Sequence, residues 1–226
     1  MSSATRTVQE TGDGPNRDAA IESYRRLAAE YDATCKATEP GRMEAIARLD
    51  LRPGQTVLDV ASGTGKSFPA LAQGVGPTGR VIAVEQSPDM ARIAQQRIDE
   101  LALANVLQTV APVEEASIDG PVDALLFHYT HDVLRTPTAL VRVFGAARPG
   151  ARVVVVGYKL PTDWRAVFNP WFRHRAKGYL STFEGIYAPW SHLLRYVPDL
   201  RIERERFLGS GYLATGTVSG EASMEN

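Results

Sequence analysis

The chain has 226 residues, of which 44% are hydrophobic, and its 25 Lys and Arg residues nearly cancel its 26 Asp and Glu residues. This length and apolar content predict one well-packed domain, and the balanced charge argues against a protein that binds nucleic acid through a global positive field. The single cysteine, Cys35, excludes an internal disulfide, and no metal-ligand spacing is present, so we expect no metal site and a reducing, cytoplasmic setting.

The first 18 residues are polar and rich in Ser, Thr and Gly, which predicts a disordered arm without an export signal. Residues 19–226 are expected to form a single domain that begins with a helical cap at 19–50. From Ala19, apolar residues recur every three and four positions, which predicts a helix that carries Tyr24 and Tyr31 on one face. The stretch "GRMEAIARLDL" predicts a second amphipathic helix. No run approaches the roughly 18 apolar residues that a membrane-spanning helix needs.

Strands and helices then alternate regularly. The predicted strands are "QTVLDV", "GRVIAVE", "NVLQTV", "VDALLFHY" and "ARVVVVGY", and the helices between them are "FPALAQGV", "SPDMARIAQQRIDELAL" and "PTALVRVFGAA". This alternation predicts a doubly wound, Rossmann-like α/β domain with a mostly parallel sheet covered on both faces. Near the end, "RIERERFLGSGYLATGTVS" contains two extended runs joined by a glycine-containing turn, which predicts an antiparallel hairpin at one edge.

The stretch "VLDVASGTGKSFPAL" admits two interpretations. Its "GTGKS" is similar to the end of a phosphate-binding loop, but Val60 occupies the position of the first required glycine. Asp123 also stands at the beginning of its strand, whereas a nucleotide-triphosphate enzyme needs a metal-binding Asp at the far end. In the other interpretation, Asp59 ends the first strand before a glycine turn, and Glu85 ends the second strand, where an acid can bind both hydroxyls of a ribose. The alternative for Glu85 is that it only caps the following helix.

Five stretches together resemble a known family, and they cover about residues 22–160. They are "SYRRLAAEYD", "PGQTVLDVASGTG", "GPTGRVIAVEQSPDMARIAQQR", "VDALLFHYTHDVL" and "ARPGARVVVVG". In order and spacing they resemble the class I S-adenosylmethionine-dependent methyltransferases, especially the ubiquinone/menaquinone-biosynthesis type. The resemblance implies a seven-stranded sheet with a reversed last hairpin and methyl transfer to an N, O or C of a small-molecule or lipid acceptor, with S-adenosylhomocysteine as product. The alternative is a protein that binds S-adenosylmethionine without transferring its methyl group.

The resemblance also implies a set of cofactor-binding residues. The loop around the methionyl part holds Asp59, Ala61, Gly63 and Gly65; Glu85 binds the ribose; Gln86 and Met90 lie beside the adenine; and Phe127 completes the set. Many relatives have an acid after the third strand, where "VAPVEE" has Pro112 and Val113 instead. We therefore expect the adenine to rest on apolar contacts and the Val113 amide, with help from Glu114. Lys66 also departs from the family, as either a solvated side chain or a contact for an anionic substrate.

The chemistry of methyl transfer directs attention to the end of the fourth predicted strand. Transfer is an in-line displacement, so the protein mainly aligns the acceptor and, where needed, removes its proton. The stretch "FHYTHD" contains the candidate catalytic residues His128, Tyr129 and His131. His131 could be a base held in one tautomer by Asp132, and His128 could lie near the methyl donor. The alternative is that these are satisfied polar groups at a strand end.

Residues 160–190 are predicted to form a lid or substrate segment that contains all three tryptophans with basic residues between them. Such a segment can be an ordinary lid, can bind an acceptor with an apolar body and an anionic head, or can contact a membrane peripherally. It gives a weaker resemblance to bacterial phosphatidylethanolamine and betaine-lipid N-methyltransferases. The competing acceptor is a small aromatic or quinone-like metabolite in a pocket lined by Tyr24, Tyr31, Trp164 and Trp190. Single-stranded nucleic acid is disfavoured because no basic groove is evident.

Overall fold

The computed structural model describes residues 15–28, 30–176 and 179–220, and within them the chain forms one seven-stranded sheet. The strands are β1 Thr56–Val60, β2 Arg80–Glu85, β3 Val106–Val110, β4 Val122–His128, β5 Ala147–Tyr158, β6 Arg201–Arg206 and β7 Gly211–Thr217. Their order is β3-β2-β1-β4-β5-β7-β6. Strands β1 to β5 pair in parallel, and β7 lies antiparallel between β5 and β6. The doubly wound fold with its antiparallel hairpin is therefore confirmed.

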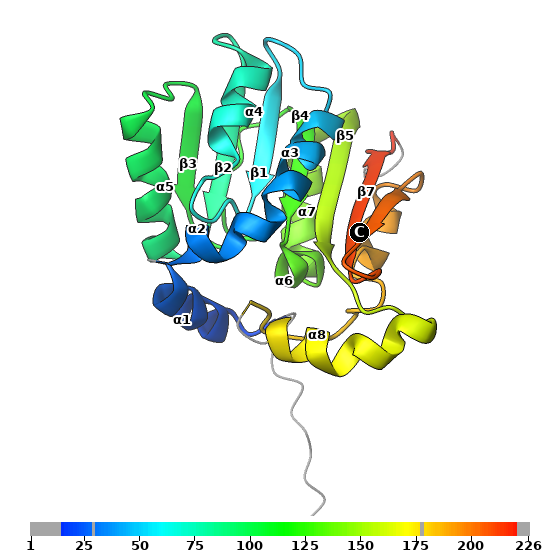
Figure 1. Ribbon diagram of the computed structural model, residues 1–226. Coiled ribbons are helices and arrows are strands. Elements are labelled where there is room, and N and C mark those ends of the chain that lie inside the picture. Colours follow the sequence, from blue (N-terminus) through cyan, green and yellow to red (C-terminus); the bar gives the residue numbers. More distant parts are fainter. Residues whose placement is uncertain (1–14, 29, 177–178, 221–226) are drawn as a thin grey trace, which may run out of the picture.

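Helices cover both faces of this sheet. They are α1 Arg17–Leu27, α2 Tyr31–Thr34, η1 Cys35–Thr38, α3 Glu39–Arg48, α4 Phe68–Val75, α5 Pro88–Glu100, α6 His131–Leu134, α7 Pro137–Ala146, η2 Trp164–Phe168, α8 Asn169–Ala176 and η3 Ser191–Arg195. Helices α3, α4 and α5 contribute to one core, and α7 with η3 to the other. Figure 1 shows α3 in front of the sheet and α1, α6 and α8 gathered at one end of the strands. None of the helices in the described ranges is long and apolar enough to cross a membrane.

The period of two along each strand decides which side chains share a face. In β1, Val57 belongs to the core under α3 and α4, whereas Leu58 belongs to the core under α7. Asp59 therefore lies on the α3 face. In β4, Leu126 lies on that same face, so His128 follows it there. Because β1 and β4 are paired neighbours, these two polar residues lie on the same face near the carboxyl ends of the strands.

The beginning of the chain differs from the prediction in two ways. The sequence predicts one helix through both tyrosines, whereas the structure has α1 and α2 with a break between them. Helix α1 also begins two residues earlier than predicted, because the Asn16 side chain accepts a hydrogen bond from the Ala19 backbone N–H at 2.9 Å and caps the helix. Its first two residues thus belong to a helix and not to the predicted arm, of which residues 1–14 lie outside the described part.

The predicted lid segment contains η2 and α8 and continues without further regular structure to η3. Residues 177 and 178 of this segment lie outside the described ranges. The short helix α6, which the sequence did not predict, follows β4 directly and turns the chain beneath the end of the sheet (Figure 1). The N-terminal cap, α6, the lid and the β6–β7 hairpin therefore surround the carboxyl end of the sheet, where ligands bind in folds of this kind.

Candidate active site

A tight turn follows β1 and carries three residues of the predicted cofactor loop. Ala61, Gly63 and Gly65 all have left-handed backbone angles, with φ of 53°, 59° and 71°. A side chain at Gly65 would place its Cβ 2.5 Å from the ring of Phe68, so only glycine fits there. Ala61 is a non-glycine residue in this region, and such strained residues cluster at ligand-binding sites. The turn thus brings backbone close to whatever lies beyond the end of β1.

Asp59 is buried next to this turn, with 2% of its surface exposed. Its Oδ2 atom has no hydrogen-bond partner among the described residues. Burial raises the pKa of the Asp59 carboxyl to about 7, although the Arg42 guanidinium works in the opposite direction. A buried carboxylate oxygen without a partner is costly in a protein interior unless a ligand satisfies it. A cationic N–H donor, such as the ammonium of a methionyl group, fits this position.

Glu85 stands at the end of β2 and organises the same turn. Its Oε2 accepts the backbone N–H of Gly63 and its Oε1 that of Ser87, both at 2.8 Å. Burial raises the pKa of Glu85, while these N–H groups lower it. The Ser87 hydroxyl, and not Glu85, accepts from the Met90 N–H and caps α5. A carboxylate has about four acceptor positions, so the two bonds leave room for the hydroxyls of a ribose.

The residues predicted to surround the adenine are Gln86, Met90, Pro112 and Val113. Met90 and Val113 are buried, with 1% and 5% exposed, and the other two are half-buried. The backbone carbonyl of Glu85 accepts the N–H of Ala111 at 3.1 Å, so the loop after β3 begins next to the end of β2. Glu114, predicted to help here, lies 3.9 Å from a guanidinium nitrogen of α1. These side chains fit an adenine held mainly by apolar contacts, and their role remains a prediction.

Two predictions around this loop need correction. Phe127 is fully buried in the core under α7, where its ring stacks on Phe144 with centroids 6.3 Å apart. Alternation along β4 turns this side chain away from the face that carries Asp59, so it does not reach the predicted cofactor site. Lys66 is neither solvated nor part of the cavity described below. Its Nζ lies 3.3 Å from Glu39 Oε2, and its side chain is only 17% exposed.

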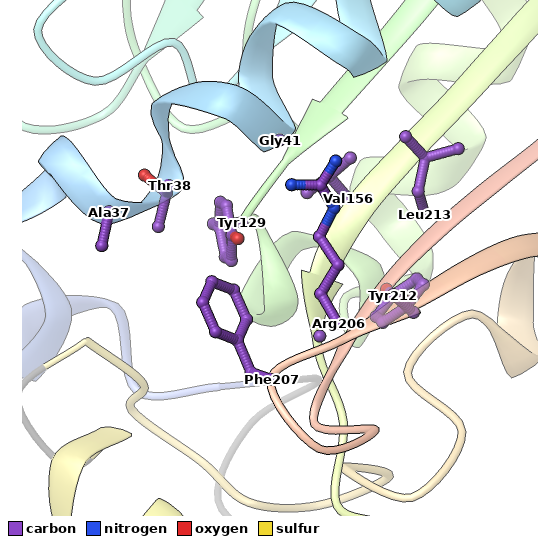
Figure 2. Close-up of a pocket in the computed structure, with 10 residues that line it drawn as sticks. Ala37, Thr38, Gly41, Tyr129, Val156, Arg206, Phe207, Tyr212 and Leu213 are labelled. Carbon is purple, nitrogen blue, oxygen red and sulfur yellow. The ribbon is translucent and has the colours of Figure 1, made fainter.

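A cavity of about 460 Å³ opens between the N-terminal cap, the ends of β4 and β5, the lid and the β6–β7 hairpin. Its wall is strongly aromatic and includes Tyr24, Tyr31, Tyr129, Tyr158, Tyr179, Tyr212, Trp171, Phe172, Phe183 and Phe207. A small hollow of about 10 Å³ adjoins it and shares part of this wall. Figure 2 shows Tyr129 there, between the Ala37–Thr38 segment and Phe207 of the hairpin turn. The cavity suits a planar, largely apolar ligand.

Both predicted catalytic histidines line the cavity, and each has a buried ring nitrogen without a partner: Nε2 in His128 and Nδ1 in His131. His131 Nε2 lies 3.1 Å from the Glu184 carbonyl oxygen, which can only accept, so in the neutral ring Nε2 carries the proton and Nδ1 a lone pair. Burial lowers the pKa of both rings, and Arg42 adds to the effect on His128. Both imidazoles are therefore neutral near pH 7 and able to accept a proton.

The predicted pairing of His131 with Asp132 does not form. Asp132 Oδ2 instead accepts the Ser181 backbone N–H at 3.2 Å. The reason is local geometry, because both residues belong to α6 and adjacent residues on a helix point in different directions. The lid carbonyl of Glu184 therefore takes the orienting role, although the Asp132 charge still acts to raise the pKa of the His131 ring against the effect of burial.

Tyr129 holds a strained position between the two histidines. Its φ is 58°, and its backbone N–H donates to the Val156 carbonyl at 2.7 Å. The ring meets that of His128 edge to face at 4.7 Å and that of Tyr158 at 4.8 Å. Burial raises the pKa of Tyr129, so its hydroxyl stays protonated. This residue can shape the cavity and donate a hydrogen bond, but it is a poor base.

The structure brings two of the four predicted substrate residues to the cavity and leaves two outside. Tyr24 and Tyr31 line it, and the Tyr24 hydroxyl donates to the Tyr179 carbonyl at 3.2 Å. Trp164 lies on η2 and is 76% exposed. Trp190 packs edge to face on Tyr212, with centroids 4.8 Å apart, at the border of the core. Neither tryptophan is part of the cavity wall, because the direction of a lid side chain depends on how the lid packs.

Several lining residues escaped the sequence analysis, notably Arg42, Tyr158, Phe207 and Tyr212. Phe207 had the clearest signal in the sequence, because it stands in the glycine-containing stretch that joins the two extended runs. In the structure its φ is 50°, in the left-handed region. Arg42 lies inside a stretch that reads as an ordinary amphipathic helix. Nothing in that local pattern distinguishes a buried arginine from an exposed one.

The N-terminal cap is tied directly to the glycine turn. Asp32 accepts a hydrogen bond from the Thr64 hydroxyl at 2.5 Å and pairs with Arg97 of α5 at 2.6 Å. Arg97 also donates to the Thr64 carbonyl. Tyr31, which precedes Asp32, forms part of the cavity wall. The same short segment therefore contacts the predicted cofactor loop and the cavity.

Comparisons with known proteins show which family the chain and its fold resemble. A family model described as protein-L-isoaspartate(D-aspartate) O-methyltransferase matches residues 22–156. A demethylmenaquinone methyltransferase of Lactococcus lactis is 27% identical over 88% of this chain and 84% of its own length. A demethylmenaquinone methyltransferase of Oceanobacillus iheyensis is 32% identical over 76% of this chain and 75% of its own length. The fold is similar to that of a SAM-dependent methyltransferase from Aquifex aeolicus, with a TM-score of 0.55, 20% identity, and coverage of 78% of this chain and 89% of that one.

Proposed function

Since the chain belongs to the class I S-adenosylmethionine-dependent methyltransferases, we propose that its acceptor is a hydroxylated aromatic ring of the reduced-quinone type. The family membership and the cofactor agree with the resemblance of the sequence motifs. Two relatives are named demethylmenaquinone methyltransferases, which supports a quinone-related acceptor here. The observation that carries the proposal is the aromatic cavity at the carboxyl end of the sheet, with two neutral histidines in its wall.

The residues of the cavity offer such an acceptor flat apolar surfaces, hydroxyl groups and proton-accepting nitrogens. A tyrosine-rich wall offers flat apolar surfaces for a ring system and phenolic hydroxyls for its oxygens. When bound, S-adenosylmethionine supplies a methyl group on a positively charged sulfur and leaves as neutral S-adenosylhomocysteine. The acceptor must provide the electron pair of the new bond and lose one proton in the net reaction. The free nitrogens of His128 and His131 can take that proton on the cavity wall.

The direct test is methyl transfer to demethylmenaquinone kept reduced with dithionite. We expect the purified protein to move radiolabelled methyl from S-adenosylmethionine into this quinol and not into the oxidised quinone, because only the reduced ring is rich enough in electrons to attack. Phosphatidylethanolamine vesicles and isoaspartyl peptide are the comparison acceptors. Label in either of these, with none in the quinol, would contradict the proposal.

An exposed apolar patch lies next to the cavity and supports a peripheral contact with a membrane. This patch, which we name the lid patch, consists of Trp164, Val167, Phe168 and Trp171, which are 76%, 72%, 39% and 56% exposed. Trp171 also lines the cavity, so the patch is continuous with its wall. The exposed Arg173 of the same segment stacks over the Phe183 ring at 4.5 Å. Aromatic side chains with a neighbouring cation suit an anionic lipid surface, which is where a quinone with a long apolar tail resides.

The lid patch is expected to dock on lipid. The double variant W164E/V167E should reduce cosedimentation with anionic phosphatidylglycerol vesicles by about tenfold, because apolar burial is lost and negative charge is added. Its turnover with a short-chain, water-soluble quinol should stay near that of the wild type. The matched control is V141E, which changes an apolar residue on α7 that is 61% exposed and far from the lid in sequence. Equal sedimentation of all three proteins would remove the membrane proposal.

A further inference from the structure

Arg42 is a buried cation in the wall of the acceptor cavity. It lies on α3 and is only 6% exposed. Its Nη1 donates to the Ser67 hydroxyl at 3.1 Å and its Nε to Glu39 Oε2 at 3.4 Å. An arginine has five N–H donors, so three of them have no acceptor among the described residues. A buried guanidinium with unused donors in a cavity wall is able to bind a ligand oxygen.

The charges around Arg42 leave its cation incompletely balanced. Glu39, its ion-pair partner, lies at the surface and is shared with Lys66, whose Nζ is 3.3 Å from the same oxygen. The other cavity cation, Lys159, has its own partner, Glu205, at 2.6 Å. No Asp or Glu occurs in the cavity wall within the described ranges. The cavity thus presents one positive charge that a ligand can neutralise.

The remaining titratable groups near Arg42 do not cancel that charge. Burial raises the pKa of the Asp59 carboxyl on β1 and the charge of Arg42 lowers it, so the two groups interact. However, this carboxyl borders the glycine turn, and we assign it to the cofactor. His128 on β4 and Tyr31 on α2 are neutral near pH 7, because burial lowers the pKa of the imidazole and raises that of the phenol. Tyr129 is neutral for the same reason as Tyr31. A bound ligand oxygen is the remaining candidate for a counter-charge.

We propose that Arg42 determines acceptor specificity by binding the acceptor as an oxyanion, a phenolate or enolate, and by excluding protonated amines. This inference rests on the proposed function and deepens it. The acceptor O–H bond breaks with its electron pair left on oxygen, and the proton passes to a cavity histidine and then to solvent. The negative charge activates the ring carbon or the oxygen as the nucleophile. A lipid amine, which is cationic at neutral pH, meets the Arg42 charge instead.

The test measures the ionisation of a bound phenol and needs no turnover. The probe is 4-nitro-1-naphthol, whose phenolate absorbs in the visible range, titrated with pH in the presence of protein and S-adenosylhomocysteine. With the wild type, the apparent pKa of the bound probe should lie about one to three units below that with R42M, because an opposite charge at contact distance favours the ionised form. The variant R42K keeps the charge and should retain most of the shift. Cationic naphthylmethylamine should bind about tenfold or more weakly than 2-naphthol, a gap that closes in R42M.

The matched control is K159M, which removes a cavity cation that already has a carboxylate partner and should leave the probe pKa unchanged. Circular dichroism verifies folding, and R42Q replaces R42M if the methionine variant does not fold. The same probe pKa in the wild type, R42M and R42Q would overturn the proposal, even if quinol methylation is observed. Absence of quinol methylation together with an Arg42-dependent probe pKa would instead contradict the proposed acceptor and leave the oxyanion site standing.

Discussion

Replacing Asp59 with asparagine is expected to weaken S-adenosylmethionine binding by about 100-fold and to abolish detectable methyl transfer. The buried Oδ2 atom has no hydrogen-bond partner among the described residues and borders the glycine turn, so we propose that it receives the cationic group of the cofactor. Removing one partner of a buried charge pair costs roughly 2–5 kcal/mol, of which the isosteric amide recovers only the neutral hydrogen bond. Isothermal titration calorimetry with S-adenosylmethionine measures this loss directly.

The same variant should have the opposite effect on the stability of the ligand-free protein. The native pKa of Asp59 is raised from 3.8 to about 7, so folding favours the protonated carboxyl. Its contribution to stability is therefore complete below pH 3.8 and is lost as the pH rises through about 7. At pH 8 the wild type must bury the carboxylate, at a cost on the order of a few kcal/mol that D59N does not bear. Thermal unfolding should show D59N as the more stable protein at pH 8.

Asp123 offers a matched control for D59N. It is also a buried aspartate, but at the opposite, amino-terminal end of the sheet, where it accepts the Thr56 N–H at 2.7 Å and pairs with Arg148. D123N should lower stability and leave the affinity for S-adenosylmethionine unchanged. An unaltered dissociation constant in D59N, or an equal loss in both variants, would contradict the role given to Asp59.

Removing both cavity histidines should produce the second large effect. The double variant H128Q/H131Q is expected to lower kcat by about 10²- to 10⁴-fold, the usual contribution of a positioned acid or base, while cofactor binding is retained. The single variant H131Q should account for most of the loss, because the contact of Nε2 with the Glu184 carbonyl fixes the tautomer and leaves the Nδ1 lone pair without a partner among the described residues. Single-turnover measurements with reduced demethylmenaquinone separate this chemical step from product release.

The pH dependence gives an independent reading of the same groups. Burial lowers the pKa of both histidines, so the neutral, proton-accepting form persists below the ordinary histidine pKa of about 6.5. The acidic limb of the kcat profile should therefore lie below that value, and it should disappear in the double variant. H174Q, on the exposed side of α8, is the control and should behave as the wild type. A double variant with wild-type kcat would show that these histidines are only structural.

The sequence by itself determined the fold and the positions of the residues that are proposed to bind the cofactor. Alternating apolar strands and amphipathic helices are local patterns, and they place Asp59 and Glu85 at the ends of β1 and β2 whatever the rest of the chain does. The glycine spacing after β1 is equally local, because a left-handed turn depends on the residues that form it. His128 and His131 could be placed at the same end of the sheet for the same reason, because the length of the apolar run shows where β4 ends.

Only the tertiary structure decided the acceptor side. Arg42 belongs to α3 and Phe207 to the hairpin turn, and Tyr129 directly follows β4. These residues line one cavity only because the sheet brings their elements together. Local patterns also did not show the surroundings of single side chains: Phe127 is buried in the core under α7, and Trp164 is exposed and is not part of the cavity wall. The physical reason is that a strand or helix pattern states which residues share a face, whereas the neighbour that covers each face depends on contacts between distant segments.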